Sequence, residues 1–393
     1  MTDCCIIGGG IIGLSIAREL AGRGLSVRVL ARDEPRSTAS WAAAGIFPPT
    51  VSAPGSPSSD ALTAWSDRLH WQWAGELRDE TGIDNGLRRC GGLHLAAAGS
   101  PLERLRDRAA RWTARGIRCE PLDAAAVVAC EPVFAGAVDR GVVAGGVLLP
   151  DESQIRPPRH LEAVRRSCAA RGVGITTGVV RELSRRSGRV EEVVVTGPGG
   201  AETVRAGTYV LAAGAWSEGL AAGLGLHVAT RPIRGQILLV RPAVRLPARV
   251  VNRGLDYLVP RDDGRLLVGS TLEDTGFDDA TTPAAVDGLL RVARDLLGAG
   301  ADAPVERAWA GLRPGSADGL PTIGRVPGIA NAIVATGHFR AGWHQSTGTA
   351  VIVADLATGR RPAFDPAPFA PDREPDSGND DSVPAVLARA AGG

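Results

Sequence analysis

Three glycines near the start of the chain have the spacing of a loop that holds a phosphate. Gly8, Gly10 and Gly13 form a G-x-G-x-x-G pattern between the apolar run 4–7 and a helix-like apolar stripe that begins at residue 11. In a strand–turn–helix unit, the first glycine permits the tight turn, the second lets the backbone approach a pyrophosphate, and the third lets helix and strand pack closely. Free N–H groups at the helix start then favour the anion. The spacing therefore predicts a dinucleotide site.

A second chemical feature is an arginine in an apolar turn far along the chain. Arg313 lies between Gly311-Leu312 and Pro314-Gly315. A buried guanidinium can bind a carboxylate through charge-assisted hydrogen bonds worth about 1.5–3 kcal/mol each, whereas an unpaired one in apolar surroundings is costly. From the residues alone, two interpretations stay open: a salt bridge within the protein, or a carboxylate ligand.

Composition removes several classes of enzyme and partner. The 393-residue chain contains no lysine, which excludes a pyridoxal phosphate Schiff base, a lysine-based aldolase and a P-loop nucleotidase. A formal net charge of +1 gives no reason to expect nucleic acid or a membrane surface. No apolar run reaches about 18 residues, and the predicted nucleotide fold begins within the first few residues, so we expect neither a transmembrane helix nor a signal peptide.

The cysteines point to a reducing setting. Six are present, without a C-x-x-C pair or any metal-binding spacing. Cys4 and Cys5 are expected to pack in the core as small apolar residues. We therefore expect no metal site and a cytoplasmic protein.

The elements that must position these residues fall into two groups. Around the glycine turn, the pattern predicts a strand at 4–7, a helix that ends at Gly24, a strand at 27–30, a helix over 60–77 and a buried strand at 209–214. From about residue 231, short strands at 236–241, 257–260 and 265–269 predict a separate antiparallel sheet, followed by helices at 286–297 and 350–356. The predicted fold class is α/β, with a Rossmann-like nucleotide domain and an antiparallel-sheet domain.

The residues after the second strand leave the dinucleotide ambiguous. Leu30 is followed by Ala31, Arg32 and Asp33. Arg32 can accept the 2′-phosphate of NADP, or Arg32 and Asp33 together can hold the adenosine of FAD. The spacing alone does not choose between them.

More specific segments resemble one flavoprotein family. They are Ser-Trp-Ala-Ala-Ala-Gly at 40–45, Arg-Pro-Ile-Arg-Gly-Gln at 231–236, Trp-Ala-Gly-Leu-Arg-Pro-Gly at 309–315, Asp-Gly-Leu-Pro at 318–321 and Thr-Gly-His-Phe-Arg at 336–340. With the glycine pattern, they make the chain resemble the D-amino-acid oxidase family over about residues 3–360, and within it the bacterial glycine oxidases linked to thiamine biosynthesis. The resemblance implies a glutathione-reductase-like FAD domain at 1–86, 151–228 and 306–364. It implies an interleaved substrate domain at 87–150 and 229–305, and we expect a flexible tail at 365–393.

The resemblance also implies the chemistry. A hydride passes from the α-carbon of glycine or another small amino acid or amine to flavin N5, the imine is hydrolysed to an oxo acid and ammonia, and oxygen takes the electrons to give hydrogen peroxide. Arg313 would bind the substrate carboxylate, Tyr257 would donate its hydroxyl to it, and Arg340 would act beside them or brace the flavin loop. Leu255 and Leu272 would line an apolar substrate pocket.

The FAD-binding residues that the resemblance implies come from both halves of the chain, and the FAD is expected to be non-covalent. They are Gly8, Gly10, Ile11, Ile12, Gly13, Arg32, Asp33, Ser40, Ala43, Ala44, Gly45, Val179, Ala213, Gly214, Trp216, His338, Arg340, Gly342, Trp343, His344 and Gln345. The helix after the 337–347 loop would point its N-terminus at the flavin pyrimidine ring. Trp343 and His344 depart from the glycine oxidase pattern, and they either contact the site or pack beneath the loop.

The electron acceptor stays open at this level. Similar sarcosine oxidases use a lysine near the flavin for oxygen activation, so here another cation, such as His338 or an arginine, would serve, or oxygen reactivity would be weak. A flavin dehydrogenase with a different acceptor, an NADP-dependent reductase and a non-catalytic flavin-binding protein are the alternatives. The expected partners are the small substrate and oxygen, with a homo-oligomer by analogy to similar oxidases.

Overall fold

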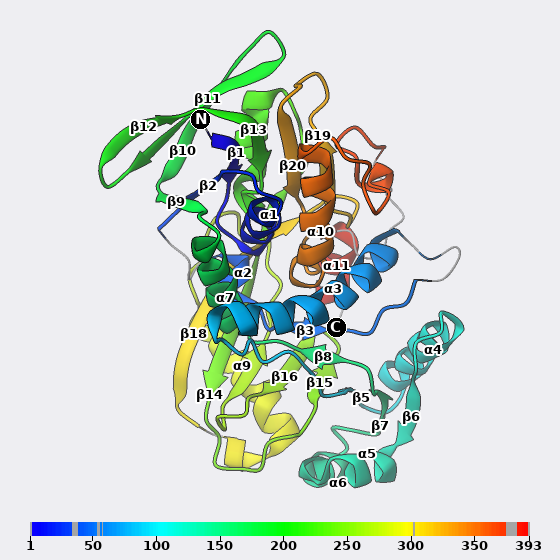
Figure 1. Ribbon diagram of the computed structural model, residues 1–393. Helices are drawn as coiled ribbons and strands as arrows, with labels where there is room; N and C mark the ends of the chain where they lie inside the picture. The colour runs from blue at the N-terminus through cyan, green and yellow to red at the C-terminus, as the bar shows by residue number, and fades with distance from the viewer. Residues whose placement is uncertain are drawn as a thin grey trace.

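A six-stranded sheet forms the centre of the nucleotide-binding half (Figure 1). The computed structural model describes residues 2–33, 38–52, 56, 58–301, 303–374 and 383–391. The strand order is β19-β20-β13-β1-β2-β9, and only the β19–β20 pair is antiparallel. The bounds are β1 (Thr2–Ile7), β2 (Val27–Ala31), β9 (Gly174–Thr177), β13 (Ala206–Leu211), β19 (Thr322–Arg325) and β20 (Ala332–Thr336). The parallel core is the framework expected of a Rossmann-like domain.

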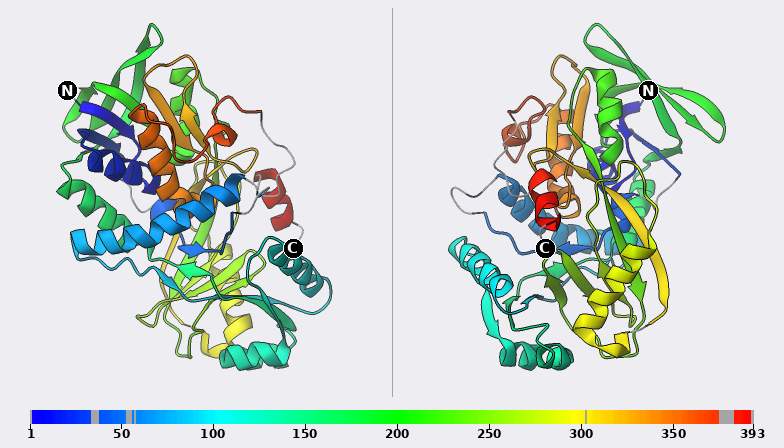
Figure 2. Two further views of the ribbon diagram at one scale, coloured as in Figure 1. Left: turned by 45° about the vertical axis from the view of Figure 1, so that its right-hand side comes forward. Right: turned by 180° about the vertical axis from the view of Figure 1, so that it is seen from behind.

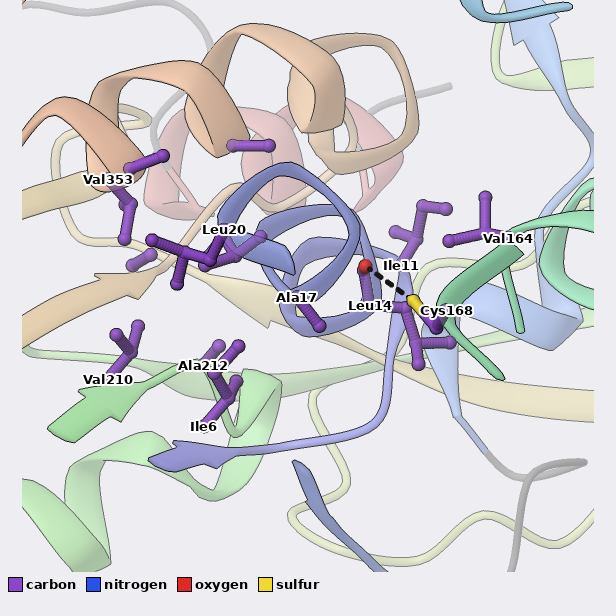
Figure 3. Close-up of a cluster of buried hydrophobic side chains, with 14 of the residues drawn as sticks. Ile6, Ile11, Leu14, Ala17, Leu20, Val164, Cys168, Val210, Ala212 and Val353 are labelled. Atoms are coloured by element: carbon purple, nitrogen blue, oxygen red, sulfur yellow. Dashed lines mark hydrogen bonds between the residues drawn. The ribbon is translucent and has the colours of Figure 1, made fainter. Parts of the chain in front are cut away.

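Helix α1 (Ile11–Gly22) lies between β1 and β2 in sequence and is buried among neighbours on several sides. Its apolar side chains pack on the sheet and on α10 (Gly342–Ala357) and α7 (Pro157–Ala170), as Figure 3 shows. The Cys168 thiol of α7 donates to the carbonyl of Leu14 at 3.5 Å. Cys4 and Cys5 are completely buried, as the sequence predicts.

The second large sheet has eight strands in the order β18-β14-β17-β16-β15-β5-β7-β6 and forms the lower part of the molecule in Figure 1. Every neighbouring pair is antiparallel except β15–β5. The bounds are β5 (Gly92–Ala96), β6 (Glu120–Asp123), β7 (Gly145–Leu149), β14 (Arg231–Val240), β15 (Val250–Arg253), β16 (Asp256–Pro260), β17 (Leu266–Gly269) and β18 (Val305–Gly315). The α/β fold class with a distinct antiparallel sheet is confirmed.

Helices and two small sheets complete the fold. The helices are α2 (Ala39–Ala42), α3 (Ser58–Thr81), α4 (Ser100–Ala114), α5 (Ala124–Cys130), α6 (Ala135–Asp139), α8 (Ser217–Ala221) and α9 (Pro283–Leu297). One small sheet joins β10 (Val179–Arg186), β11 (Arg189–Gly197) and β12 (Gly200–Val204), and the other joins β3 (Ile46–Phe47), β8 (Ser153–Gln154) and β4 (Arg88–Arg89). In the part of the chain that the structure describes, no helix is both long and apolar enough to cross a membrane.

Two boundaries differ from the sequence-based expectation. The helix expected at 350–356 begins eight residues earlier, at Gly342, because the polar residues of its first turns are buried against α3. Strand β18 pairs along its whole length with β14. It therefore belongs to the eight-stranded sheet, and the boundary expected between 305 and 306 places it in the wrong half.

The C-terminal residues are the larger correction. Phe369, in a short 3-10 turn, is completely buried, as are Val383 and Val386 of helix α11 (Val383–Ala391). Arg373 forms an ion pair of 2.9 Å with the buried carboxylate of Asp318. The expected flexible tail at 365–393 is thus wrong for residues 365–374 and for helix α11, since Phe369, Val383 and Val386 join the folded core. The rest of that segment lies outside the described residues.

Candidate functional site

The glycine turn has a backbone that no other residue would fit. Gly8 has a φ of 124°, and a Cβ there would lie 2.1 Å from the carbonyl oxygen of Ala212. A Cβ on Gly13 would lie 1.9 Å from the carbonyl oxygen of Gly8. Such approaches are far inside van der Waals contact, so both glycines are needed for α1 to sit against β1 and β13.

The start of α1 is left open to an anion. Its cap residue is Gly10, which has no side chain to bond the helix N–H groups, and no acidic residue lies in the first turn. Ser40, from α2, comes beside it and accepts a hydrogen bond of 2.9 Å from the N–H of Ile11. The positive end of the helix dipole is therefore not neutralised within the turn, as a pyrophosphate site requires.

A pocket at the end of β2 collects the residues expected near the adenosine. Arg32, Asp33 and Val179 line it together with the 196–198 turn. The guanidinium of Arg32 lies 4.6 Å from the centre of the Trp216 ring, on its face. The structure thus brings Arg32, Asp33, Val179 and Trp216 to one place.

The guanidinium of Arg313 lies among neutral oxygen atoms. It donates to the hydroxyl of Ser270 at 2.9 Å and to the carbonyl of Thr271 at 3.2 Å. Among the described residues, no carboxylate forms an ion pair with it, and burial lowers its pKa. Among the described residues the structure therefore shows no salt bridge from Arg313; the charge of Glu273 acts on it, but that carboxylate is paired with Arg234. A partly buried cation without a direct ion-pair partner is the arrangement that a carboxylate ligand would complete.

Two glycines within strands make room for the side chains of this cluster. A Cβ on Gly235 would lie 2.0 Å from Nη1 of Arg313, and a Cβ on Gly269 would lie 2.5 Å from the hydroxyl of Tyr257. Tyr257 is paired directly with Gly269 across the β16–β17 ladder. Burial raises the pKa of Tyr257, so its phenol is protonated at neutral pH and available as a hydrogen-bond donor.

Arg340 contributes positive charge to the same cluster. Its side chain is exposed, and its charge acts on both residues: it opposes the rise that burial causes in the pKa of Tyr257, and it adds to the lowering that burial causes in the pKa of Arg313. Leu272 packs against the apolar cluster that contains Phe339, the residue before Arg340. The structure therefore brings together Tyr257, Arg313, Arg340 and Leu272. Leu255 lies in the turn between β15 and β16, partly buried, and its role stays a prediction.

His338 is not the cation that the sequence suggested. Its Nε2 forms a hydrogen bond of 3.0 Å with the hydroxyl of Thr349 in α10. Burial lowers the pKa of His338 to about 3, so the ring is neutral at physiological pH. Of the cations weighed from the sequence, an arginine remains, and Arg340 is the one beside the cluster.

The side chains at the start of α10 face neighbouring helices. Trp343 Nε1 donates to the carbonyl of Ser40 at 2.9 Å, His344 Nε2 lies 3.0 Å from the carboxylate of Asp67, and Gln345 Nε2 donates to Thr63 at 3.0 Å. His344 also stacks on Phe47. Of the two alternatives, the structure packs Trp343 and His344 beneath the loop, so what they can offer a cofactor directly is their backbone.

Several positions escaped the sequence analysis. Gly235, Gly269 and Ser270 shape the Arg313 cluster, and a glycine inside a strand is a signal of close approach that could have found the first two. Arg261, at the end of β16, is buried and donates to the carbonyl of Ala44 at 2.9 Å. It ties the eight-stranded sheet to the 43–45 segment expected to hold the cofactor.

Comparisons with known proteins agree with this arrangement. A family model described as FAD dependent oxidoreductase (DAO) matches residues 3–356. A glycine oxidase of Pseudomonas aeruginosa is 37% identical over 369 residues, which cover 93% of this chain and 97% of that protein. A bifunctional ThiO/ThiG protein of Trichormus variabilis is 33% identical over 90% of this chain and 52% of its own length. The crystal structure of a glycine oxidase from Geobacillus kaustophilus superposes with a TM-score of 0.86 at 32% identity, covering 95% of this chain and 99% of that one.

The residues present fit FAD as the cofactor. The 8–13 turn would hold its pyrophosphate at the start of α1, and the pocket at Arg32 and Asp33 would hold its adenosine. The turn's fit rests on the Gly8 and Gly13 backbone contacts, which a Cβ would block. The family match over residues 3–356 sets aside the NADP alternative that Arg32 left open.

Proposed function

Because the chain belongs to the family of FAD-dependent oxidoreductases, we propose that it oxidises glycine or another small amino acid or amine whose nitrogen lies beside a carboxylate. The observation that carries this proposal is the partly buried guanidinium of Arg313, whose hydrogen-bond partners among the described residues are neutral oxygen atoms. The glycine oxidase of Pseudomonas aeruginosa, similar over nearly its whole length, supports the choice of substrate.

The protein's own contribution is to bind and orient the substrate. FAD, when bound, accepts a hydride from the α-carbon of the substrate. Arg313 holds the carboxylate through two N–H groups, and the protonated phenol of Tyr257 donates to the same carboxylate. Fixing the carboxylate at two points limits the rotation of the α-carbon, which is how a positioning site lowers the barrier.

No acid–base pair is required of the chain. A substrate amine that binds in its neutral form already carries the electron pair that becomes the C=N bond. Arg313 and Arg340 add positive charge around the site, which favours the neutral amine over the ammonium form. The imine then leaves for hydrolysis to the oxo acid and ammonia.

Oxygen is the electron acceptor in this proposal, and the product is hydrogen peroxide. The chain lacks lysine and His338 is neutral, so Arg340 supplies the positive charge near the flavin. A dehydrogenase that passes electrons to a carrier is the second candidate. Peroxide release in air, compared with reduction of a dye without oxygen, separates the two.

We also place the protein in a reducing, cytoplasmic setting. All six cysteines are free, and three of them are buried. Burial raises the pKa of Cys4 and Cys168, so their thiols are protonated and unreactive.

The test is a substrate screen on the purified flavoprotein. Glycine, sarcosine, D-alanine and larger amines are each assayed for peroxide and ammonia. Wild type should oxidise at least one of them, and Arg313→Ala should raise the KM sharply, whereas Arg291→Ala, an exposed arginine on α9, should behave as wild type. Equal turnover in Arg313→Ala and wild type would show that the carboxylate is bound elsewhere.

A further inference from the structure

Helix α11, formed by the last described residues of the chain, packs next to the arginine cluster. Its Val383 and Val386 are completely buried. They form one apolar cluster with Ile233 and Phe339, and Leu272 and Leu387 pack against it. In the view from behind, α11 lies where the two halves of the molecule meet, beside the eight-stranded sheet (Figure 2).

Strand β18 shows how close this helix comes to Arg313. Gly311, Arg313 and Gly315 alternate along the strand and so share one face. A Cβ on Gly311 would lie 2.5 Å from Cβ of Ala42, and a Cβ on Gly315 would lie 2.5 Å from Cγ2 of Val383. The segment that contains Ala42 therefore packs against β18 on one side of Arg313, and α11 packs against it on the other.

The neighbours of Arg313 lead to the same place. Ile233 is paired directly with Arg313 across the β14–β18 ladder, so both side chains point to one face. Leu272 follows Thr271, whose carbonyl accepts from the guanidinium. Both Ile233 and Leu272 contact α11 through the cluster it forms with Phe339. Apolar side chains from two strands and one helix therefore border the cation.

We infer that α11 forms an apolar wall of the substrate site and limits the size of the group that the substrate carries on its α-carbon. This inference rests on the proposed function. A carboxylate bound at Arg313 has its α-carbon one bond away, so a substituent on that carbon lies near the cluster of Leu272, Phe339 and α11. Leu387 is partly buried at the edge of this cluster, so its size can be changed without opening the core.

The first experiment changes the size of Leu387 in the full-length flavoprotein. The kcat/KM values for D-valine and glycine are compared in wild type, Leu387→Ala and the control Ala388→Ser, which alters an exposed position of the same helix. In Leu387→Ala, the ratio of D-valine to glycine should rise about tenfold, since a few methylene groups in an apolar pocket are worth that much. A ratio equal to that of Ala388→Ser overturns the inference.

A second variant works in the opposite direction and keeps the cluster filled. Leu387→Phe should lower the same ratio of D-valine to glycine several-fold. This variant keeps the inference testable if Leu387→Ala fails to fold. If Leu387→Phe leaves the ratio of D-valine to glycine unchanged, the inference that α11 forms a wall of the site is wrong.

A binding measurement separates this inference from the proposed function. The Kd values of acetate and isovalerate are measured from changes in flavin absorbance, which needs no turnover. If wild type oxidises no amine but Leu387→Ala binds isovalerate about tenfold tighter relative to acetate, the proposed oxidation is wrong and the wall stands. If amines are oxidised, but Leu387→Ala changes neither the kcat/KM ratio of D-valine to glycine nor the Kd ratio of isovalerate to acetate, the wall is wrong and the proposed oxidation stands. If no carboxylate binds at all, both fail.

Discussion

The glycine turn at 8–13 and the Arg313 cluster both depend on glycines, but the glycines make room for different groups in the two places. In the turn, Gly8 and Gly13 let one stretch of backbone approach another. In the eight-stranded sheet, Gly235 and Gly269 make space for the side chains of Arg313 and Tyr257. The turn itself is formed by residues close in sequence, although Gly8 also lies against Ala212, whereas the Arg313 cluster is formed by strands that pair in the sheet. The proposed cofactor site can thus be largely local, whereas the proposed substrate site depends on register across the sheet.

The largest effect is expected from removing the cation of the sheet cluster. Arg313→Ala should lower kcat/KM by about 10³-fold, because loss of a buried charge partner for a carboxylate costs several kcal/mol. FAD content should stay at the wild-type level, since the turn is untouched. Steady-state kinetics with a flavin count per chain checks both parts. Loss of the flavin together with the activity would mean that the two regions are not separable.

The next prediction fills the space beside the guanidinium. Gly235→Ala should lower kcat/KM by about 10²-fold, because its Cβ would lie 2.0 Å from Nη1 of Arg313 and displace the fork from its position. Gly219→Ala is the control, since its Cβ meets nothing within 4 Å. Kinetics as in wild type for Gly235→Ala would show that the guanidinium can move without cost.

The corresponding change in the turn should act on the cofactor instead. Gly13→Ala places a Cβ 1.9 Å from the carbonyl oxygen of Gly8, which forces α1 away from the turn. The Kd for FAD should rise about 30-fold, a typical cost of overpacking, while turnover per bound flavin stays near that of wild type. Measurement of FAD binding by apoprotein titration checks this. A variant with normal FAD affinity but impaired turnover would reverse the assignment of the two regions.

A smaller effect is expected at Tyr257. Tyr257→Phe removes one hydroxyl donor to the carboxylate and should raise the KM about tenfold. The pKa of Tyr257 is raised by burial, so no loss of activity from its ionisation should appear below pH 10. A pH–rate profile of wild type and Tyr257→Phe tests this. A wild-type decline near pH 8 that the variant lacks would contradict a protonated phenol.

The smallest prediction concerns stability beneath the cofactor half. Burial lowers the pKa of His70 to about 3 from an ordinary value of 6.5, so the folded protein keeps the ring neutral while the unfolded chain takes up a proton below pH 6.5. His70 therefore stabilises fully above pH 6.5, and this contribution is lost as the pH falls from 6.5 towards 3.

Denaturation at pH 7 and pH 5 measures that contribution. When the pH is lowered from 7 to 5, the free energy of unfolding of His70→Gln should fall by about 2 kcal/mol less than that of wild type. His227→Gln, at a side chain that is 79% exposed, should lose as much as wild type. If His70→Gln and wild type lose equal stability, His70 is not held neutral by burial.

The contrast between the two regions also explains what the sequence could predict. The 8–13 turn, its strand and its helix follow from spacing within a few residues, and so did the α/β class. Arg313 stood out by its apolar turn, but its assignment to a carboxylate ligand, and the role of Tyr257, came only from the family resemblance. Their partner Ser270 and the space at Gly235 follow from the pairing of β14 with β18 and of β16 with β17. Such pairings are not encoded in local periodicity.

The C-terminal helix escaped prediction for the same reason. Residues 365–393 are rich in proline, alanine and aspartate, which locally resembles a mobile extension. Val383 is buried because it meets Gly315 and Ile233, which lie more than 60 residues away in the chain. His338, in the loop before α10, shows the opposite error: from the sequence it was a candidate cation, and only its burial reveals a neutral ring.

The most direct test of the account is whether Arg313 binds a carboxylate. Acetate and acetamide are titrated into wild-type and Arg313→Ala flavoproteins, and the flavin absorbance is followed. Acetate should bind wild type, and Arg313→Ala should bind it at least about 100-fold more weakly, whereas acetamide should bind neither. Equal acetate affinity in the two proteins would contradict the central claim.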